Sequence, residues 1–224
     1  MTDLTLIIPA KNESESLPQV LDELENYSYQ KRIILHEDDK DTIASIKSNA
    51  HEIIYQKGKG YGNALITGVN SIKTKYFCIF NADGSFNPSE IEKMINKLEN
   101  NNLDFIFASR YEKNSGSEDD TFLTFIGNKI FSLIGKLFFG LNISDILYTF
   151  VLGKTKNCKD LNLKSQDFRF CVELPIKAKR KKMKLSTSNS FERKRIAGIK
   201  KVNEFADGFK ILIYLVKIFI DRRA

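Results

Sequence analysis

The chain of 224 residues contains no tryptophan, only three cysteines and only two histidines. Cys78, Cys158 and Cys171 show no metal-ligand spacing, and Cys78 lies inside an apolar, strand-like run. This pattern excludes a disulfide framework or a cysteine-bound zinc site and predicts reduced thiols that act as small hydrophobic side chains. His36 and His51 have no second ligand at metal spacing, so both are predicted to be structural or exposed.

Long hydrophobic runs are missing as well. The N-terminal segment MTDLTLIIPA lacks the basic stretch and long apolar run of a signal peptide. No stretch approaches the roughly 18 to 20 apolar residues that span a bilayer, and we therefore expect a cytoplasmic protein. With 42% hydrophobic residues, the chain has enough apolar side chains for one α/β domain with a sizeable core.

Charge is distributed unevenly along the chain. Residues 1–120 carry 13 basic and 20 acidic residues, a net charge of −7, whereas residues 121–224 carry 22 and 8, a net charge of +14. This asymmetry indicates that the second half faces phosphates, an acidic membrane surface or nucleic acid. A merely solvated basic surface is the alternative, and we favour it for 177–184. Because that stretch has no interleaved aromatic residues, a nucleic-acid-binding module is a weak interpretation and no nucleic-acid partner is expected.

The first half alternates short apolar runs with amphipathic segments. Strands are predicted at 4–8, 33–35, 52–55, 76–80 and 103–108, and helices at 17–24, 42–49, 64–72 and 91–98. This alternation predicts a mostly parallel sheet covered by helices on both faces. Functional residues are then expected at the carboxyl ends of the strands.

Two broadly apolar helices are predicted in the second half, at 122–141 and 210–221. Each has a narrow polar stripe, formed by Asn128, Lys129, Ser132 and Lys136 in the first and by Lys210, Tyr214, Lys217 and Asp221 in the second. Such wide apolar faces suit burial against the sheet, which we favour, or partial insertion into a membrane surface.

The strongest local signal is FNADGSFNP at 80–88. Asp83 follows a buried strand on a Gly-Ser turn, where an acidic side chain can hold a divalent cation together with the phosphates of a substrate. Asn81 can add an amide oxygen or bind a metal-held water. Taken alone, Asp83 could equally satisfy the amides of a turn.

Further motifs accompany this one in a set order. They are IIPAKNESESLP, HEDDKDT, KGKGYGNALITG and NADGSFNP, followed by ASRY, GNKIF, SDILYTF and ERKRIAGIKK. Their order and spacing resemble the family 2 glycosyltransferases, and the later motifs resemble the dolichyl-phosphate mannose synthase branch. The resemblance implies a GT-A, Rossmann-like fold with amphipathic C-terminal helices. It implies one glycosyltransferase domain over 1–224, with a nucleotide-sugar-binding half at 1–110 and an acceptor half at 111–224.

The resemblance also implies the site residues. Substrate and nucleotide would be bound by Pro9, Ala10, Asn12, Glu13, Glu37 or Asp38, Lys59, Asn81, Ala82, Ser85, Glu173, Gly198 and Lys201. Asp83, with Asn81, would hold Mg²⁺ or Mn²⁺. The Asp-x-Asp motif of the family reads Asn-Ala-Asp here, which removes one carboxylate and leaves an inactive relative as an alternative.

Glycosyl transfer places negative charge on a diphosphate leaving group while the sugar becomes cation-like. The resemblance implies that Arg110 and Arg195 neutralise this charge and that Asp145 acts in catalysis beside Asp83. A lipid phosphate is already an anion and can attack directly, whereas a sugar hydroxyl must lose a proton, for which Asp167 would be the base. Asp167 could instead cap the following helix.

The resemblance, together with these features, implies a metal-dependent transferase that moves a hexose from a GDP- or UDP-hexose to a polyprenyl phosphate, and inversion is implied by the resemblance alone. The enzyme would be peripheral, at the inner face of a membrane. The sequence leaves open whether it forms a homo-oligomer or binds a membrane-protein partner. The nearest alternative is transfer to a sugar hydroxyl in a polysaccharide or cell-surface glycan. A sugar-phosphate nucleotidylyltransferase would need a Gly-rich loop after the first strand, and 9–16 contain no glycine.

Overall fold

The computed structural model describes residues 3–46, 51–198 and 200–221. Its centre is a seven-stranded sheet in the order β3-β2-β1-β4-β7-β5-β8. The strands are β1 (Leu4–Pro9), β2 (Gln30–Leu35), β3 (Glu52–Tyr55), β4 (Tyr76–Ile79), β5 (Phe105–Ser109), β7 (Val151–Lys154) and β8 (Leu185–Asn189). β7 runs antiparallel to β4 and β5, and the other pairings in this sheet are parallel. A separate parallel pair joins β6 (Gly116–Ser117) to β9 (Phe191–Glu192).

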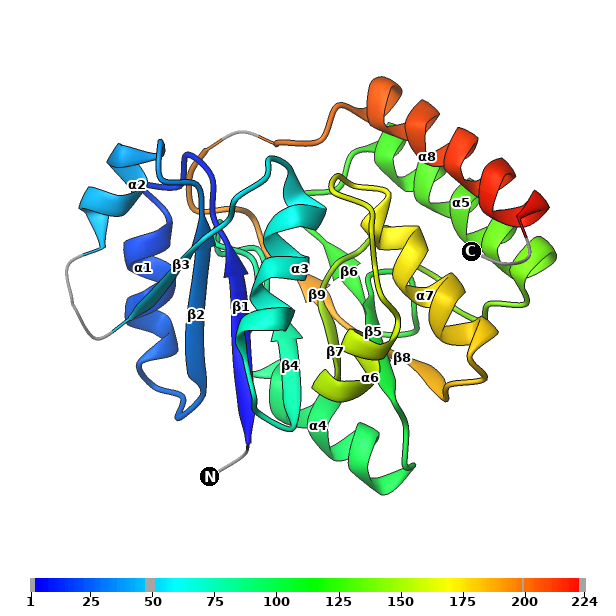
Figure 1. The fold of residues 1–224 in the computed structure, drawn as a ribbon, viewed down its shortest axis with the longest axis horizontal. Coiled ribbons are helices and arrows are strands. Elements are labelled where there is room, and N and C mark those ends of the chain that lie inside the picture. The colour runs from blue at the N-terminus through cyan, green and yellow to red at the C-terminus, as the bar shows by residue number, and fades with distance from the viewer. Residues whose placement is uncertain (1–2, 47–50, 199, 222–224) are drawn as a thin grey trace.

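Helices cover both faces of the sheet (Figure 1). They are α1 (Leu17–Leu24), α2 (Lys40–Ser45), α3 (Tyr61–Ser71), α4 (Glu90–Asn100), α5 (Phe122–Phe139), α6 (Thr155–Asp160), α7 (Phe170–Arg180) and α8 (Glu204–Ile220). The apolar sides of α1 and α4 pack on one face, and those of α3, α6 and α7 pack on the other. The predicted α/β architecture, a mostly parallel sheet between helical layers, is confirmed.

The central strands supply both cores because successive side chains of a strand point to opposite faces. In β1, Leu6 and Ile8 join the core beneath α1 and α4, whereas Ile7 joins the core beneath α3 and α7. In β4, Cys78 joins the core beneath α1 and α4, and Phe77 joins the core beneath α3 and α7. Strands that are apolar on both sides therefore form the middle of the sheet, as expected for parallel strands covered twice.

Two expectations from composition have clear outcomes. All three cysteines are free and buried, which confirms their role as small hydrophobic side chains. The lysine-rich stretch 177–184 is not merely a solvated face. The side chain of Lys177 is only 12% exposed, and its Nζ lies 2.8 Å from Oε1 of the buried Glu173.

The boundaries differ from the prediction at several points. α2 ends at Ser45, and residues 47–49 of the predicted helix lie outside the described residues. α8 begins at Glu204 and not at 210, because the Asn203 side chain caps it by accepting a hydrogen bond from Ala206 N. β7, β8 and α6 were not predicted, since the runs that form them are short and lack a clear period.

α5 and α8 lie side by side at one end of the molecule and run in the same direction (Figure 1). Near their first turns, the Thr124 hydroxyl donates to Glu204 at 2.9 Å. Near their last turns, the ring of Phe219 meets Phe138 and Phe139, with centroid distances of 5.5 and 5.9 Å. Only one side of this helix pair faces the rest of the protein, mainly through α7.

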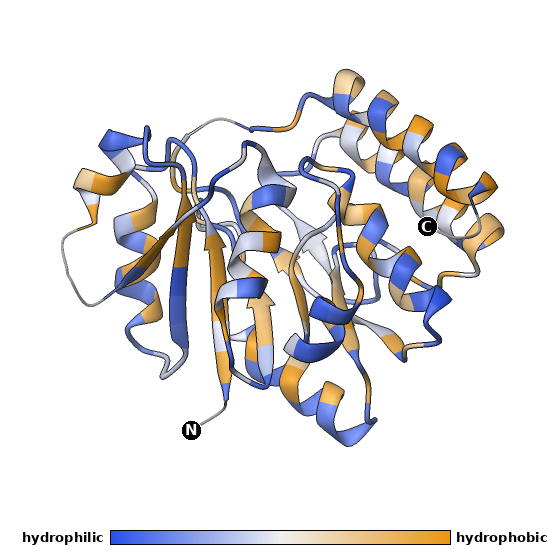
Figure 2. Cartoon of the chain, in the orientation of Figure 1, coloured by the Kyte–Doolittle hydropathy of each residue, from blue (hydrophilic) through white to orange (hydrophobic). Residues whose placement is uncertain are grey.

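Burial on α5 is the reverse of what we expected, and most apolar side chains of both helices are exposed. On α5 the buried residues are Asn128, Ser132 and Gly135. The exposed apolar side chains are Phe122, Leu123, Phe125, Ile126, Ile130, Leu133, Leu137 and Phe138 on α5, and Phe205, Phe209, Leu212, Ile213, Val216, Phe219 and Ile220 on α8. We call these side chains the apolar face. Figure 2 shows apolar residues along both helices.

The prediction that these apolar helices are buried against the sheet is thus wrong for α5 and for most of α8. α8 buries Ile211, Leu215 and Ile218, whereas α5 turns polar and small residues inward. The expectation about long apolar stretches is also corrected. By length and composition alone, the 18-residue helix α5 is long and apolar enough to cross a membrane, and only 17% of it is buried.

Substitution by alanine is expected to have opposite effects on stability at two glycines. A Cβ on Gly62 would lie 2.2 Å from Ser165 O, whereas a Cβ on Gly127 inside α5 would meet no atom within 4 Å. We therefore expect Gly62→Ala to lower the free energy of unfolding by about 1–3 kcal/mol. Gly127→Ala should raise it by roughly 0.5–1 kcal/mol, because alanine favours helix. Thermal unfolding followed by circular dichroism compares them, and a fully stable Gly62→Ala variant would contradict this packing.

Candidate active site

A cavity of about 580 Å³ lies at the carboxyl ends of β1, β2 and β4, a volume typical of small-molecule sites. Its lining includes the polar residues Asn12, Glu13, Asp38, Asp39, Lys59, Asn81, Asp83, Ser85, Arg110, Asp119, Asp120, Asn128, Glu192, Arg195, Lys200 and Lys201. Pro9, Ala10 and Ala82 line it as well. Residues from both halves of the chain therefore meet where the parallel strands end.

The loop after β1 forms one end of the cavity. Asn12 adopts a left-handed conformation with φ of 52°, and its backbone N–H donates to Asp39 Oδ2 at 2.7 Å. Of the two acidic residues left open by the sequence, Asp38 lines the cavity, and Glu37 is not among the lining residues. Asp39 was missed, although its position before Thr42 is a helix-capping signal: it accepts from Thr42 N at 3.3 Å.

Glu13 links this loop to the C-terminal segment. Burial raises the pKa of Glu13, although the Ser16 hydroxyl and Lys201 oppose the shift. Ser16 donates to Glu13 at 2.8 Å, and Lys201 Nζ lies 3.4 Å from its other oxygen. Gly198 lies beside the pair: a Cβ there would lie 3.5 Å from Glu13 Oε2. Lys200 and Lys201 therefore line one edge of the cavity, with Gly198 beside it.

The loop after β4 presents Asp83. Ser85 donates to Asp83 Oδ1 twice, from its backbone N at 3.0 Å and from its hydroxyl at 2.7 Å. The second oxygen, Oδ2, lies 3.8 Å from Arg195 Nη1. Arg195 arrives here because the C-terminal segment crosses the loop, with Ile196 N donating to Asp83 O at 2.8 Å. Gly84, with φ of 81°, permits this crossing, since a Cβ would lie 2.5 Å from Ile196 Cδ1.

The donor atoms at this loop fit a divalent cation that is held partly by its substrate. Among the described residues, Asp83 Oδ2 accepts no hydrogen bond, and the contact of Asn81 Oδ1 is a long one of 3.4 Å with the Tyr61 hydroxyl. In residues 3–46, 51–198 and 200–221, no group of three or more histidine, cysteine or carboxylate side chains is arranged to hold a metal. Mg²⁺ commonly takes one or two carboxylates and completes its shell with substrate phosphates and water.

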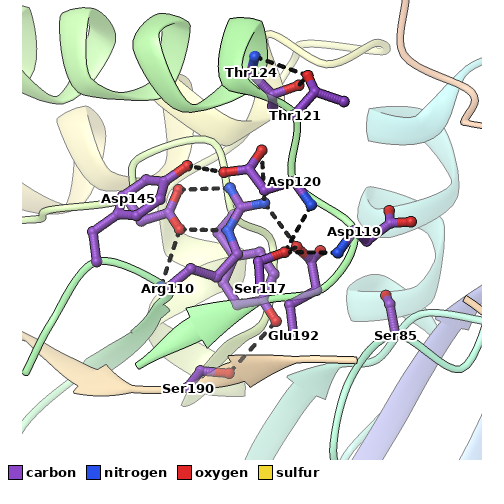
Figure 3. Close-up of polar contacts among 12 residues, drawn as sticks. Ser85, Arg110, Ser117, Asp119, Asp120, Thr121, Thr124, Asp145, Ser190 and Glu192 are labelled. Carbon is purple, nitrogen blue, oxygen red and sulfur yellow. Dashed lines mark hydrogen bonds and ion pairs between the residues drawn. The ribbon is translucent and has the colours of Figure 1, made fainter. Parts of the chain in front are cut away.

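Arg110, at the end of β5, is held by buried carboxylates (Figure 3). Its Nε and Nη2 donate to the two oxygens of Asp145 at 2.7 and 3.0 Å, and its Nη1 donates to Glu192 at 3.0 Å. Although burial opposes it, these two carboxylates raise the pKa of Arg110 above its ordinary value. Asp145 is fully buried and is absent from the cavity lining, so it orients Arg110 from behind.

Three lining carboxylates escaped the sequence reasoning. Burial raises the pKa of Glu192, although Arg110 opposes the shift. Asp119 pairs with Arg195, and Asp120 accepts from the Tyr111 hydroxyl at 2.6 Å. They meet because β6 pairs with β9, which brings residues 116–117 to 191–192. The stretch EKNSGSEDD has the composition of a polar loop, and a two-residue strand pair leaves no readable period in a sequence.

Other predicted residues lie elsewhere. Glu173 is 1% exposed, does not line the cavity, and accepts from the backbone N–H groups of Lys164 and Ser165 at 3.0 and 2.7 Å. Asp167 is also absent from the lining. It does not cap α7, whose N-cap is Arg169. Although partial burial opposes it, hydrogen bonds from Arg169 lower the pKa of Asp167.

Lys59 lines the cavity at the start of α3, as predicted. One backbone N–H group in the first turn of α3 already has a partner within the protein, because Asn63 N donates to Gln166 O at 2.9 Å. His36, predicted to be structural or exposed, lines the cavity too, with its Nδ1 3.1 Å from Asp38.

The sequence model described as glycosyl transferase family 2 matches residues 5–161. The chain belongs to this family. The matched residues contain the loops after β1 and β4, with Asp83, and the Arg110–Asp145 pair. The later cavity residues, including Glu192 and Arg195, lie outside the matched part.

Relatives and solved structures agree with this membership. A UDP-N-acetylglucosamine–dolichyl-phosphate N-acetylglucosaminyltransferase of Methanococcus voltae is 26% identical over 205 residues, covering 80% of this chain and 81% of that protein. The low-salt glycan biosynthesis hexosyltransferase Agl6 of Haloferax volcanii is 20% identical and covers 95% of this chain and 53% of its own length.

Among solved structures, glucosyl-3-phosphoglycerate synthase of Mycobacterium tuberculosis, in complex with Mn²⁺, UDP and phosphoglyceric acid, superimposes with a TM-score of 0.75. The match covers 96% of this chain and 78% of the synthase at 12% identity. The predicted GT-A fold is confirmed. The dolichyl-phosphate mannose synthase branch stays a prediction.

A Glu173 variant tests whether this residue stabilises the fold or binds the nucleotide. We expect Glu173→Gln to lower the free energy of unfolding by about 1–3 kcal/mol, because the amide cannot accept hydrogen bonds from two backbone N–H groups and Lys177 as the carboxylate does.

Although burial opposes it, Lys177 and the backbone N–H groups hold the pKa of Glu173 below its ordinary 4.5. Its contribution should be complete above that pH and be lost as the pH falls through the lower, folded-state pKa. Chemical unfolding at neutral and acidic pH measures this. Weaker nucleotide binding with unchanged stability would contradict it.

Proposed function

We propose that this enzyme transfers a hexose from a UDP-sugar to a polyprenyl phosphate at a membrane surface. The observation that carries this proposal is the position of α5. Its inner side lines the cavity with Thr124 and Asn128, while its outer side carries the exposed apolar face. One helix thus connects the reaction cavity with a surface suited to lipid.

The donor end of the cavity supports a nucleotide diphosphate sugar. The loops after β1 and β2 offer Asn12, Glu13 and Asp38 toward a nucleoside, and the loops after β3 and β4 offer Lys59 and Asp83 toward a diphosphate. We favour UDP over GDP because the Methanococcus relative is named for a UDP-sugar and the mycobacterial synthase was solved with UDP. On this proposal 1–110 form the donor half, and 111–224 form the acceptor half.

In the proposed reaction, an oxygen of the acceptor phosphate attacks the anomeric carbon as the bond from that carbon to the diphosphate breaks. A divalent cation bound with Asp83 and Asn81 would stabilise the charge on the departing diphosphate. Arg195 lies 3.8 Å from Asp83 and is positioned to share this task. Arg110 contributes a fixed positive charge, since its hydrogen bonds to Asp145 and Glu192 hold it in place.

Direct attack requires no general base, because a phosphate monoester is already an anion near neutral pH. Transfer to a sugar hydroxyl would require one. Asp167, the base expected for that alternative, is absent from the cavity lining and has a lowered pKa. Glu192 lines the cavity with a raised pKa, and Asp120 lines it with an oxygen, Oδ1, that has no hydrogen-bond partner among the described residues. These two carboxylates are the candidate bases for a hydroxyl acceptor. Direct transfer to a hydroxyl-bearing glycan is therefore the second candidate function.

The donor prediction is tested by calorimetric titration with UDP and GDP, each with and without Mn²⁺. We expect Mn²⁺-dependent binding of UDP and a loss of roughly tenfold or more in affinity for Asp83→Ala, because that carboxylate supplies a metal ligand. Ser85→Ala is the matched control: it removes one hydrogen bond to Asp83 and should weaken binding much less. Preference for GDP would overturn the donor assignment, and binding independent of Mn²⁺ would overturn the metal's role.

The apolar face is proposed to lie on an anionic bilayer. Exposed lysines accompany it on both helices, namely Lys129, Lys136, Lys210 and Lys217. Apolar side chains that enter the interface and lysines that meet anionic headgroups are the two features of peripheral amphipathic helices. The net charge of the second half has the matching sign.

Vesicle sedimentation tests this surface. We expect the protein to bind phosphatidylglycerol-containing vesicles, and the double variant Leu137→Glu, Phe209→Glu to bind about tenfold or more weakly, because each change removes an apolar side chain from the interface. The two side chains are 68% and 64% exposed. Tyr55→Glu is the control, since Tyr55 is 48% exposed at the opposite edge of the sheet. Equal binding by all three proteins would count against the apolar face.

A further inference from the structure

The inner side of α5 carries a polar stripe whose middle member has an amide oxygen with no hydrogen-bond partner among the described residues. Thr124, Asn128 and Ser132 follow one another at intervals of four residues, which places them on one side of the helix. Thr124 accepts from Lys200 Nζ at 2.6 Å, and Ser132 accepts from Ile146 N at 3.1 Å. Each of these outer members thus has a structural hydrogen bond.

Asn128 differs from its two neighbours. It is 1% exposed, and its Oδ1 has no hydrogen-bond partner among the residues that the structure describes. An amide buried without partners destabilises a fold by about 1–3 kcal/mol, so such groups are rare unless a ligand or water completes them. Asn128 also lines the cavity, so the missing partner can come from a bound substrate.

We infer that Asn128 binds the phosphate head group of the acceptor, an inference that rests on the proposed function. A carboxamide carries a donor that can hydrogen-bond a phosphate oxygen and an acceptor for a protonated one, and it adds no negative charge. Lys200, held one turn away at Thr124, adds positive charge on the same wall. The head group would then lie against the inner side of α5 while its chain leaves toward the apolar face.

This position suits an anion better than a hydroxyl. Arg195 pairs with Asp119. Asp120 Oδ1, which has no hydrogen-bond partner among the described residues, lies 3.8 Å from Arg110 Nη1. Both carboxylates thus face arginines, and Asn128 adds a neutral amide donor. A phosphate needs such a donor, whereas a hydroxyl acceptor would also need a base beside it.

The experiment measures transfer by the full chain from radiolabelled UDP-glucose or UDP-N-acetylglucosamine to a C55 polyprenyl monophosphate in mixed micelles. We expect Asn128→Ala to raise the acceptor KM about tenfold or more, the value of a hydrogen bond to a charged group, with donor KM unchanged. Asn128→Asp, which is nearly isosteric but anionic, should lose more, because it repels the phosphate. A hydroxyl acceptor would tolerate that change.

Two controls separate binding from folding. Glu173→Gln, at a residue outside the cavity lining, weakens hydrogen bonds to the backbone of Lys164 and Ser165 and should lower the melting temperature while leaving the acceptor KM unchanged. Asn128→Ala should leave the melting temperature unchanged or raise it, since it removes a buried polar group without a protein partner. The inference about Asn128 is overturned, without any effect on the proposed function, if Asn128→Ala folds and keeps the acceptor KM. It is overturned in the same way if Asn128→Asp is fully active. Wild-type protein that binds UDP but transfers no sugar to the lipid phosphate overturns the proposed function together with it.

Discussion

The acceptor side of the cavity depends on one buried ion pair, Arg110 with Asp145. The arginine ends β5, and the carboxylate lies in the segment that leads from α5 to β7, so the pair joins the sheet to the wall beside α5. Glu192 extends it to β9. Loss of one partner from a buried pair leaves an uncompensated charge, which is far more destabilising than the pair is stabilising. The pair therefore fixes where Tyr148 and Thr149 line the cavity.

The second constraint is the orientation of α5. A helix in a water-soluble protein usually turns its apolar side to the core. Here the fully buried residues are small or polar, while Phe131, Ile134 and Phe139 are only partly buried against the core. Ser132 holds the segment that contains Asp145 through a hydrogen bond to Ile146 N. The same helix thus supports the buried ion pair, lines the cavity and presents an apolar surface. On the proposed function, a single element would connect the chemistry with the environment of a lipid substrate.

Sequence periodicity was sufficient for β1 to β5 and for the donor loops, because apolar strands followed by polar turns are local patterns, but it missed β7 and β8 of the same sheet. It failed on α5, since a hydrophobic pattern gives the width of an apolar stripe and not what lies opposite it. It also failed on Asp119 and Glu192, which reach the cavity through a pairing between residues more than 70 positions apart. Glu173 and Asp145 were recognised as important, but only the packed structure shows that neither lines the cavity.

The C-terminal segment that crosses the Asp83 loop also determines at which stage of folding the cavity can form. Arg193 bonds Glu23 across a separation of 170 residues, and Lys201 reaches Asn12 across 189. Contacts of such long range form late in folding, since the entropy of closing the loop must be overcome first. On a ribosome, the donor loops would emerge long before the residues that cover them. The cavity would be completed only as α8 follows, so the enzyme would become able to react at the stage when its apolar helices are both available to meet a bilayer.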